Sequence, residues 1–470
     1  MNERMKTIRQ ILALSCLLLA PTTAWAQGSN GQTFESAREA VAHMRVGWNL
    51  GNTLDSNSGD TLHMWIEAEK NRTISTYETA WGQRVTTAPL FKMFKEAGFN
   101  AIRVPVTWYP HMEASFSSVR GYSDRGTWKY TPWLPSADDI GKQIQRDWMR
   151  RVHEVVDYVV GQGMYCILNI HHDTGASNTA WLIADEAVYA QQRERFEAIW
   201  TQIAEEFKDY DEHLLFEGYN EMLDSYRSWC FASFASPKRY DAATASSAYK
   251  AINSYAQSFV NAVRATGGNN AQRNLIVSTY GACDGNGDWN SHLQDPLKEM
   301  KLPADGAENH LIFEVHSYPD ISNLASAKNT VNATIGHVKN YLVSKGAPVI
   351  FGEWGISGGG ENRANHVAFV KFFAERCKAN GMGLFYWMGL SDGSHRTVPE
   401  FNEQDLVDAM MEGFYGEGGY VGIDQVKAPE GVSPEGAASG SSPILYDLGG
   451  RRLGAPRGLC IIGGRKVLVK

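Results

Sequence analysis

Two glutamates, Glu221 and Glu353, each end or follow a short apolar run that has the pattern of a β-strand. If both runs belong to one parallel barrel, the two carboxylates meet at the rim formed by the carboxyl ends of the strands. Such a pair can cleave a glycosidic bond, because one group protonates the departing oxygen while the other meets the oxocarbenium-like carbon. We predict Glu221 as the general acid/base and Glu353 as the nucleophile. Either residue taken alone would fit equally well as a buried ion-pair partner or a solvated loop residue.

Other side chains that can support this chemistry fall within, at the end of, or just past further predicted strands. They are Arg103, His171, His172, Asn220, His316, Tyr318 and Trp387. An arginine keeps a nearby carboxylate charged, a tyrosine hydroxyl can hydrogen-bond the nucleophile, and Asn220 can hold the 2-hydroxyl of the reacting sugar. We predict Trp387 as a platform on which a sugar ring stacks.

Three more acidic residues are candidates for the same chemistry: Glu217, Glu314 and Asp173. Glu217 and Glu314 lie inside predicted strands rather than beyond their ends, so we predict structural roles for both. Two roles stay open for Arg103, because it can keep a catalytic carboxylate ionised or simply pair with Glu314.

The adjacent histidines His171 and His172 suggest a metal site. Neighbouring residues on a strand point to opposite faces, so we predict that the two rings do not chelate one ion. We expect at least one of them to face the barrel mouth as a hydrogen-bond donor. The six cysteines have no C-x-x-C spacing, so neither a zinc site nor a disulfide scaffold is expected. We predict a mechanism without metal or cofactor.

Residues 355–359 (GISGG) match the G-x-S-x-G pattern of the nucleophile elbow in α/β-hydrolases. An elbow needs a strand that stops directly at the serine and a helix that starts behind it. Here the predicted strand stops at Glu353 and a glycine-rich run follows. We therefore favour the carboxylate pair over a serine nucleophile.

The elements that must position these residues alternate along the chain as short β-branched or aromatic runs and longer segments of helical period. Strands are predicted at 46–50, 101–106, 165–170, 214–218, 274–278, 311–315, 349–352 and 383–386, with helices at 148–160, 193–207, 248–265 and 366–379 among the segments between them. This pattern predicts a (β/α)8 TIM barrel as a single catalytic domain with a short C-terminal tail.

The ends of the chain differ in composition from the barrel. Residues 1–26 combine a basic start, an apolar run and an Ala24-Trp25-Ala26 cleavage site, which predicts a signal peptide and a secreted or cell-surface protein. The catalytic domain is predicted at 27–423, a Pro-, Gly- and Ser-rich linker at 424–443, and the tail at 444–470. A net charge of −8 disfavours nucleic acid or an anionic membrane as partner, and no later run is long enough to span a bilayer.

Seven motifs, in order along the chain, resemble those of glycoside hydrolase family 5. They are GWNLGNTLD at 47–55, ETAWG at 78–82, FNAIRVPV at 99–106, NIHHD at 169–173, YNE at 219–221, VHSY at 315–318 and FGEWG at 351–355. The resemblance covers residues 40–415. It implies Glu221 as acid/base and Glu353 as nucleophile, with supporting site residues Arg103, His171, Asn220, His316, Tyr318 and Trp387. We predict Asn49 and His172 as further supporting residues. Met222 departs from the family pattern, in which many members carry proline.

The segments WLI at 181–183, FEAIW at 196–200 and FKDY at 207–210 resemble subfamily 4 of that family. This resemblance implies a retaining endo-β-1,4-glucanase acting on plant cell-wall glucans. Xyloglucan or mixed-linkage glucan is the alternative substrate, with mannan and xylan less favoured. A non-catalytic carbohydrate-binding barrel is the rival from another class, but such a protein would have lost one of the two carboxylates.

The tail, with YDLGGRR at 446–452 and GGRKVLVK at 463–470, resembles the end of type IX secretion sorting domains. The resemblance implies a secretion machinery as partner. The alternative is a disordered basic tail without a sorting role.

Deletion of residues 444–470 should leave the thermal stability and the activity of the barrel nearly unchanged, because a linker that cannot bury apolar surface separates the two segments. A thermal melt and a reducing-sugar assay on soluble β-glucan would measure both properties. Loss of the cooperative melt would show that the tail belongs to the catalytic fold.

Overall fold

The computed structural model describes residues 33–57, 73–112, 141–177, 179–228, 240–286, 292–358 and 362–420, and the backbone of the short strands at 121–124, 127–130, 445–446, 452–453, 458–462 and 465–469. The predicted signal peptide at 1–26 and linker at 424–443 lie outside the described residues. The chain divides into two compact units, Met1–Gly422 and Ile423–Lys470.

The first unit contains a closed barrel of eight parallel strands in the order β1-β10-β9-β8-β7-β6-β5-β2. Their bounds are β1 Val46–Asn49, β2 Ala101–Val104, β5 Tyr165–Asn169, β6 Leu214–Glu217, β7 Leu275–Ser278, β8 Leu311–Ser317, β9 Val349–Trp354 and β10 Gly383–Tyr386. Each lies on one of the predicted strands, so the (β/α)8 barrel is confirmed. β8 and β9 continue two residues beyond their predicted ends.

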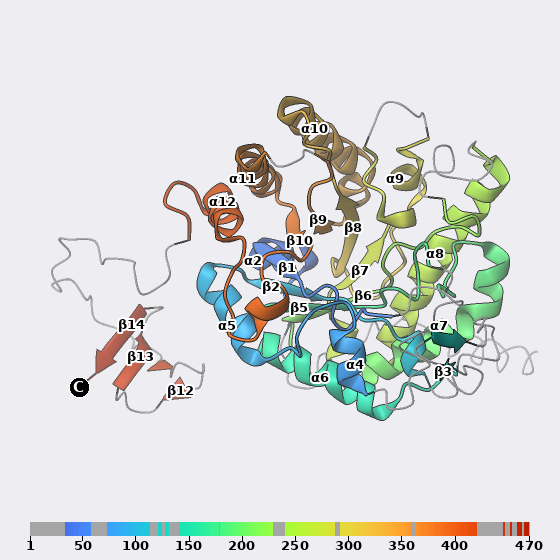
Figure 1. The fold of residues 1–470 in the computed structure, drawn as a ribbon, viewed down its shortest axis with the longest axis horizontal. Coiled ribbons are helices and arrows are strands. Elements are labelled where there is room, and N and C mark those ends of the chain that lie inside the picture. The colour runs from blue at the N-terminus through green and yellow to red at the C-terminus, as the bar shows by residue number, and fades with distance from the viewer. Residues whose placement is uncertain are drawn as a thin grey trace, which may run out of the picture. The chain divides into compact units, whose positions relative to one another are not determined.

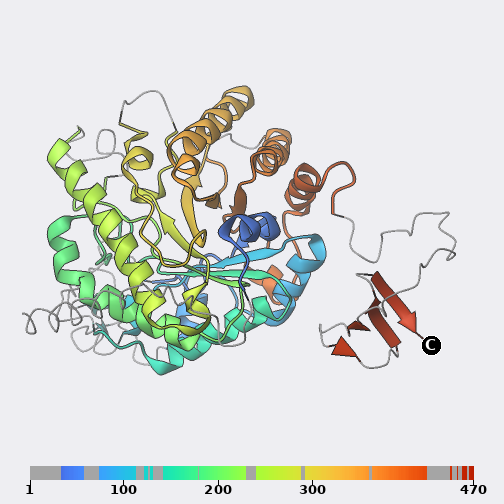
Figure 2. The ribbon, with the colours of Figure 1, turned by 180° about the vertical axis from the view of Figure 1, so that it is seen from behind.

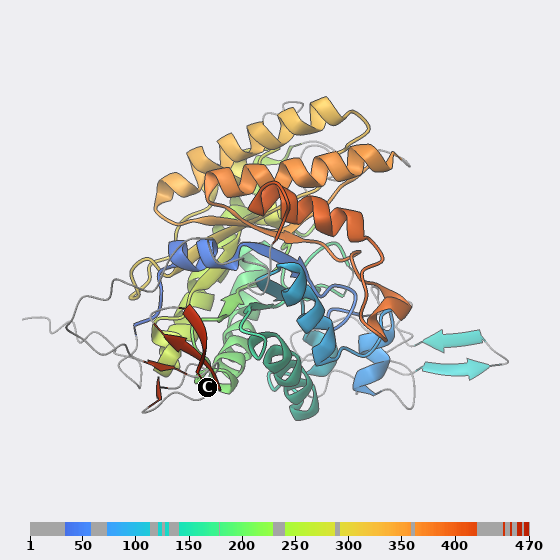
Figure 3. The same cartoon turned by 90° about the vertical axis from the view of Figure 1, so that its left-hand side faces the viewer.

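Helices surround the barrel (Figure 1). They are α2 Ala37–Met44, α4 Ile74–Thr79, α5 Ala88–Ala97, α6 Arg146–Val160, α7 Glu186–Glu206, α8 Ala242–Ala265, α9 Asp295–Glu299, α10 Leu324–Tyr341, α11 Arg363–Asn380 and α12 Gln404–Tyr415, with short 3-10 turns at Tyr109–His111, Gly268–Ala271, Tyr280–Ala282, Val343–Lys345 and Gly393–Arg396. The last three long helices, α10 to α12, lie side by side (Figure 3). Among the described residues, no helix combines the length and the apolar character needed to cross a membrane.

Local chemistry explains where the long helices begin and end. Asp185 and Asp241 each accept hydrogen bonds from two backbone N–H groups in the first turn of α7 and α8. Gly98 and Gly381 end α5 and α11 in the left-handed conformation that glycine adopts without a steric cost. These caps set the lengths of the helices and return the chain to the next strand.

Two layers of side chains fill the interior of the barrel. The lower layer is apolar, and α2, seen in front of the strands in Figure 2, packs against it. It contains Ala101, Tyr165, Ile167, Leu215, Ile276, Ile312, Ile350 and Phe385, together with Ala37, Ala40, Val41 and Met44 of α2. In five of the strands, the residue two positions after the apolar one also points into the barrel, and it is polar. These residues are all fully buried: Arg103, Asn169, Glu217, Ser278 and Glu314. The period of two in a strand therefore builds a polar layer directly above an apolar one.

A β-bulge interrupts the pairing of β8 with β9. Glu314 pairs with Ile350 and Val315 with Phe351, but His316 pairs with Glu353, so Gly352 is the extra residue. A bulge changes the direction of the side chain that follows it, and here it turns Glu353 toward the interior. A Cβ atom at Gly352 would lie 1.5 Å from Oε1 of Glu314, so only glycine fits.

The segments outside the barrel include strands that the sequence analysis did not predict. β3 Gly121–Asp124 and β4 Thr127–Tyr130 form an antiparallel pair within the first unit. The second unit contains an antiparallel sheet in the order β12-β11-β13-β14. Its strands are β11 Leu445–Tyr446, β12 Arg452–Leu453, β13 Gly458–Ile462 and β14 Arg465–Val469.

Substitution of Gly352 by alanine should destabilise the barrel by about 1–3 kcal/mol or more, because the new methyl group collides with a buried carboxylate. Chemical unfolding followed by fluorescence would measure the change in the free energy of unfolding. Gly336→Ala in α10 is the matched control: no atom lies within 4 Å of its added Cβ, so stability should stay or rise slightly. Identical unfolding of Gly352→Ala and the wild type would contradict the close contact with Glu314.

Candidate active site

Arg103 lies at the centre of the polar layer, and each of its hydrogen bonds orders a neighbour. Nε and one terminal nitrogen bind the carboxylate of Glu217 at 2.6 and 2.8 Å. The remaining bonds go to Asn49 Oδ1 at 2.9 Å, Glu353 Oε1 at 2.9 Å and Asn220 Oδ1 at 2.7 Å. These contacts use all the donors of a guanidinium group. Burial alone would lower the pKa of Arg103, but Glu217 and Glu314 outweigh it and raise the pKa well above its usual range.

Glu353, the predicted nucleophile, is only 4% exposed. Arg103 donates to its Oε1 at 2.9 Å and the hydroxyl of Tyr318 donates to its Oε2 at 2.6 Å. Burial and the charge of Glu353 raise the pKa of Tyr318 well above its usual range, so the phenol keeps its proton and remains a donor. These two donors hold both carboxylate oxygens of Glu353 in one orientation.

Glu221, the predicted acid/base, has a different environment. Its Oε1 is 2.9 Å from Nδ1 of His316. Burial raises the pKa of Glu221, the charge of Glu353 raises it further, and His316 opposes the shift only in part. One ligand atom each of Glu221, His316 and Glu353 lies within 4.8 Å of the other two. The structure thus brings the two carboxylates together in different environments, and the environment of Glu221 favours its protonated form.

His316 lies between carboxylates on several sides. Nδ1 is 2.9 Å from Glu221 and 3.5 Å from Glu353, while Nε2 is 3.4 Å from Glu314. Burial alone would lower the pKa of His316, but these carboxylates outweigh it and raise the pKa to about 10. The ring is therefore an imidazolium that donates from both nitrogens at neutral pH.

Glu217 and Glu314, for which only structural roles were predicted, are part of this charge network. Glu217 holds Arg103 through two hydrogen bonds, and Glu314 lies 3.4 Å from Nε of Arg103. The two roles considered for Arg103 therefore coexist, because it contacts Glu353 and Glu314 at the same time. Asn169 and Ser278 belong to the same layer and were missed. The alternation of apolar and polar residues within the strands was the signal that could have revealed them.

Asn49 and Asn220 were both predicted as supporting residues, and the structure places them differently. Asn49 is fully buried, and its amide nitrogen donates to the carbonyl oxygens of Gly352 and Phe385. It therefore joins three barrel strands beneath the rim. Asn220 follows β6, and Arg103 fixes its amide oxygen, which directs the NH2 group to the opposite side.

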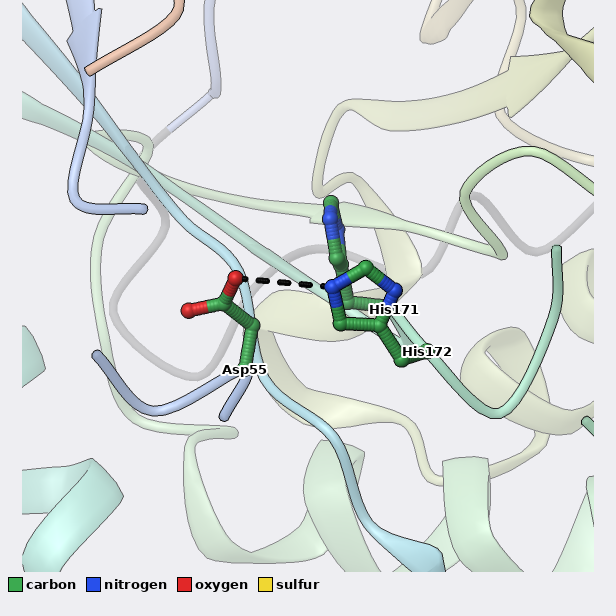
Figure 4. A group of neighbouring side chains, drawn as sticks. All are labelled: Asp55, His171 and His172. Carbon is green, nitrogen blue, oxygen red and sulfur yellow. Dashed lines mark ion pairs between the residues drawn. The ribbon is translucent and has the colours of Figure 1, made fainter. Parts of the chain in front are cut away.

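His171 and His172 lie beside Asp55 (Figure 4). The argument that the two rings point to opposite faces of a strand was wrong, because β5 ends at Asn169, before either histidine. The ring centroids are 4.5 Å apart, and Nε2 of His172 is 3.6 Å from Oδ2 of Asp55. The three side chains offer ligand atoms that lie within 4.8 Å of one another. The donor set alone would suit a transition metal.

The hydrogen bonds of His171 nevertheless make this group a poor metal site. The amide nitrogen of Asn169 donates to Nδ1 of His171 at 3.1 Å, and the amide oxygen accepts from Val106, which fixes the orientation of the amide. The proton of the neutral ring therefore lies on Nε2, 3.8 Å from Oε1 of Glu353. Burial, with the neighbouring imidazole of His172, keeps the pKa of His171 well below its usual range. A metal ion at His171 would have to break one of these contacts.

Aromatic rings line the same region. Trp387, half-buried after β10, lies parallel to the ring of His171 with centroids 5.6 Å apart. Trp81, whose indole N–H donates to the carbonyl oxygen of Asn57, is tilted against His172 with centroids 5.3 Å apart. Trp387 was predicted as a sugar platform, whereas Trp81 was noted only within a motif. Their positions beside the two histidines suit stacking of sugar rings.

Two other candidates have structural roles. Asp173 accepts from the backbone of Trp108 and Tyr109 and from the indole of Trp181, and burial raises its pKa to about 6. It therefore ties two loops together. Ser357, the serine of the elbow pattern, donates to the carbonyl oxygen of Tyr318. β9 ends at Trp354, three residues before Ser357, so the described residues here lack the strand that an elbow needs directly before its serine.

Comparisons with known proteins agree with this geometry. A family model described as Cellulase (glycosyl hydrolase family 5) matches residues 65–392. Endoglucanase B of Neocallimastix patriciarum is 32% identical over 378 residues, which cover 77% of this chain and 66% of that protein. Endoglucanase A of Clostridium longisporum is 28% identical over 405 residues, or 81% of this chain and 66% of that protein. The chain thus spans 66% of the length of each of these two curated relatives.

Solved structures match over nearly their whole length. A GH5-4 broad specificity endoglucanase from an uncultured bacterium is 47% identical, with a TM-score of 0.72 over 82% of this chain and 97% of that chain. A glycoside hydrolase family 5 enzyme from Prevotella bryantii, in complex with a xyloglucan tetradecasaccharide, is 37% identical, with a TM-score of 0.66 over 81% of this chain and 99% of that chain. Since the family model covers more than half of the sequence and the barrel carries the expected carboxylate pair, the chain belongs to glycosyl hydrolase family 5.

Proposed function

We propose that the protein is a retaining endo-β-1,4-glucanase that hydrolyses internal bonds of plant cell-wall glucans by double displacement. The observation that carries the proposal is the pairing of Glu221 with Glu353 in contrasting environments, with ligand atoms within 4.8 Å of each other. Retaining glycosidases hold their carboxyl groups about 5–5.5 Å apart, whereas inverting enzymes need roughly 6.5–9.5 Å for a water between them. The short separation supports direct attack by Glu353.

In the first step, an oxygen of Glu353 forms a bond to the anomeric carbon while the glycosidic C–O bond breaks. Glu221 gives its proton to the departing oxygen, so the leaving sugar departs as a neutral alcohol. Arg103 and Tyr318 hold the nucleophile in one orientation. Asn220, directed by Arg103, presents its NH2 group as a donor for the 2-hydroxyl of the reacting sugar.

In the second step, Glu221 takes a proton from water, and the water oxygen displaces Glu353 from the anomeric carbon. Glu221 changes from acid to base because the charge on Glu353 changes between the two steps. The negative charge of Glu353 contributes to the raised pKa of Glu221, and this contribution disappears when Glu353 becomes an ester. Glu221 is therefore more acidic in the intermediate and can act there as a base.

The relatives support a β-glucan as substrate. Solved neighbours include a broad specificity endoglucanase from Ruminococcus champanellensis with bound cellotriose and a lichenase from Caldicellulosiruptor in complex with cellotetraose. We place β-1,4-glucan or mixed-linkage glucan first and xyloglucan second, with mannan and xylan less favoured. The rival proposal of a non-catalytic binding barrel is disfavoured because both carboxylates are present and correctly partnered.

We also propose that the protein is exported and acts outside the cytoplasm. The support is the sequence of residues 1–26 and the resemblance of residues 446–470 to a sorting signal. A polymeric glucan cannot cross a membrane, so its hydrolysis requires an exported enzyme. Fractionation of cells that express the full chain, compared with a chain lacking 444–470, would test both signals.

Glu353→Gln and Glu221→Ala should lose activity on different sets of substrates. Glu353→Gln should retain glucan binding but lose about 10³-fold or more in turnover on every substrate, because a neutral amide cannot form the covalent intermediate. Glu221→Ala should be similarly impaired on polysaccharide, yet retain fast glycosylation with aryl glycosides whose leaving groups need no protonation. Steady-state and burst kinetics on soluble β-glucan and dinitrophenyl β-cellobioside would measure the contrast. Equal losses on both substrates for Glu221→Ala would argue against its acid role.

Hydrolysis should proceed with retention of anomeric configuration, because no water fits between the two carboxylates. Proton NMR of a fresh digest should show the β-anomer first, followed by mutarotation to the equilibrium mixture. Initial appearance of the α-anomer would mean that Glu353 activates water instead of attacking carbon. The nucleophile assignment would then have to be withdrawn.

A further inference from the structure

Glu314 is a buried carboxylate in β8 that lies beside the catalytic groups and contacts neither the reacting carbon nor the nucleophile. Its Oε2 accepts a hydrogen bond from Ser278 at 2.6 Å, and its Oε1 faces Nε2 of His316 at 3.4 Å. The space around it is narrow, since a Cβ at Gly352 would lie 1.5 Å from Oε1. The carboxylate is therefore held against the histidine in one orientation.

His316 connects Glu314 to the acid/base. Its Nε2 faces Glu314 and its Nδ1 faces Oε1 of Glu221 at 2.9 Å. An imidazolium has one N–H on each side, so the ring can donate to both carboxylates only when it carries both protons. Other groups face the same ring or its partners: Glu353 is 3.5 Å from Nδ1, and Arg103 lies 3.4 Å from Glu314. Glu314 is thus the only one of the three neighbouring carboxylates that contacts the ring at Nε2.

The need to balance the charge of Arg103 does not by itself explain why a carboxylate is buried at position 314. Glu217 already forms two hydrogen bonds with the guanidinium, at 2.6 and 2.8 Å. The approach of Glu314 to Arg103 is an ion pair at 3.4 Å, while the hydrogen bonds of Glu314 go to Ser278 and His316. Burial alone would raise the pKa of Glu314, but Arg103 and His316 outweigh it and lower the pKa, so the group stays ionised.

We propose that Glu314 is a positioning residue for proton transfer: it keeps His316 protonated and oriented, and His316 in turn holds Glu221 toward the glycosidic oxygen. The proposal rests on the proposed function of Glu221 as acid/base. Loss of the Glu314 charge should weaken proton delivery while leaving Arg103, Tyr318 and the nucleophile in place. Glu217 differs from Glu314 in its contacts, because it hydrogen-bonds to Arg103 and Asn169 but does not contact His316.

The two carboxylates therefore offer a matched pair of variants, Glu314→Gln and Glu217→Gln. Each exchanges a buried carboxylate beside the same arginine for an amide of equal size. The measurement is kcat/KM on a series of aryl β-cellobiosides whose leaving groups differ in pKa, from dinitrophenyl to unactivated phenyl. For Glu314→Gln, we expect the loss on the poorest leaving group to exceed the loss on dinitrophenyl by about 10-fold or more, as for a weakened general acid. For Glu217→Gln, we expect the same loss across the series.

A second measurement does not require activity. NMR of the protein labelled with 13C-histidine, with His316→Gln used to assign the signal, would follow the protonation of His316. We expect Glu314→Gln to lower the pKa of His316 far enough for the ring to lose its proton near neutral pH, because an opposite charge next to the ring is removed. Thermal melts of both variants would establish that each retains the fold.

Three outcomes separate the possibilities. If Glu314→Gln shows a steeper dependence of kcat/KM on the leaving-group pKa together with a lowered pKa of His316, the proposal is supported. Equal losses across the series, or an unchanged pKa of His316 in a folded Glu314→Gln variant, would overturn it. Absence of hydrolysis by the wild type on all glucans and aryl cellobiosides would instead overturn the proposed function, and the NMR result would still decide whether Glu314 controls His316.

Discussion

The buried guanidinium of Arg103 is the interaction on which the rest of the site depends. A charge removed from water is costly unless every donor is paired, and here Glu217, Glu353, Asn49 and Asn220 together accept the hydrogen bonds of the group. The same contacts that neutralise Arg103 also orient the nucleophile and the amide beside the reacting sugar. The stability of the barrel and the proposed catalytic role of the site therefore depend on the same residue, Arg103 in β2.

The bulge between β8 and β9 makes this arrangement geometrically feasible. Strict alternation would turn Glu353 away from the interior, since Ile350 faces the lower core and the side chains repeat every second residue. The extra residue, Gly352, shifts the register by one and brings Glu353 opposite His316. Because that residue has no side chain, it also leaves the volume that Glu314 occupies. One glycine thus serves both the nucleophile and the charge network behind the acid/base.

The two carboxylates that we propose as catalytic differ in the groups that donate hydrogen bonds to them. Glu353 receives hydrogen bonds from Arg103 and Tyr318, whereas Glu221 has only His316 as a side-chain partner. Arg103, which contacts Glu353 directly, is a permanent cation, whereas His316, which contacts Glu221, is a cation only while it is protonated. The two carboxylates that we propose as nucleophile and acid/base are therefore held by different partners, and burial together with the charge of Glu353 raises the pKa of Glu221.

The sequence by itself determined the strands and the barrel, and it predicted Glu221 and Glu353 as a pair, which the structure places close together. Short runs rich in β-branched residues and bounded by turn residues favour buried strands, and reactive residues at the carboxyl ends of barrel strands meet at one rim. The tertiary structure decided which side chains contact one another in the site. Glu217 and Glu314 were assigned to structure because they lie inside strands, and only the closed barrel shows that strands far apart in sequence bring them to Arg103 and His316. The argument about the strand faces of His171 and His172 failed because β5 ends at Asn169, before either residue. A strand pattern predicts which face a side chain occupies, but its charge and protonation depend on neighbours that only the folded chain brings within a few ångströms.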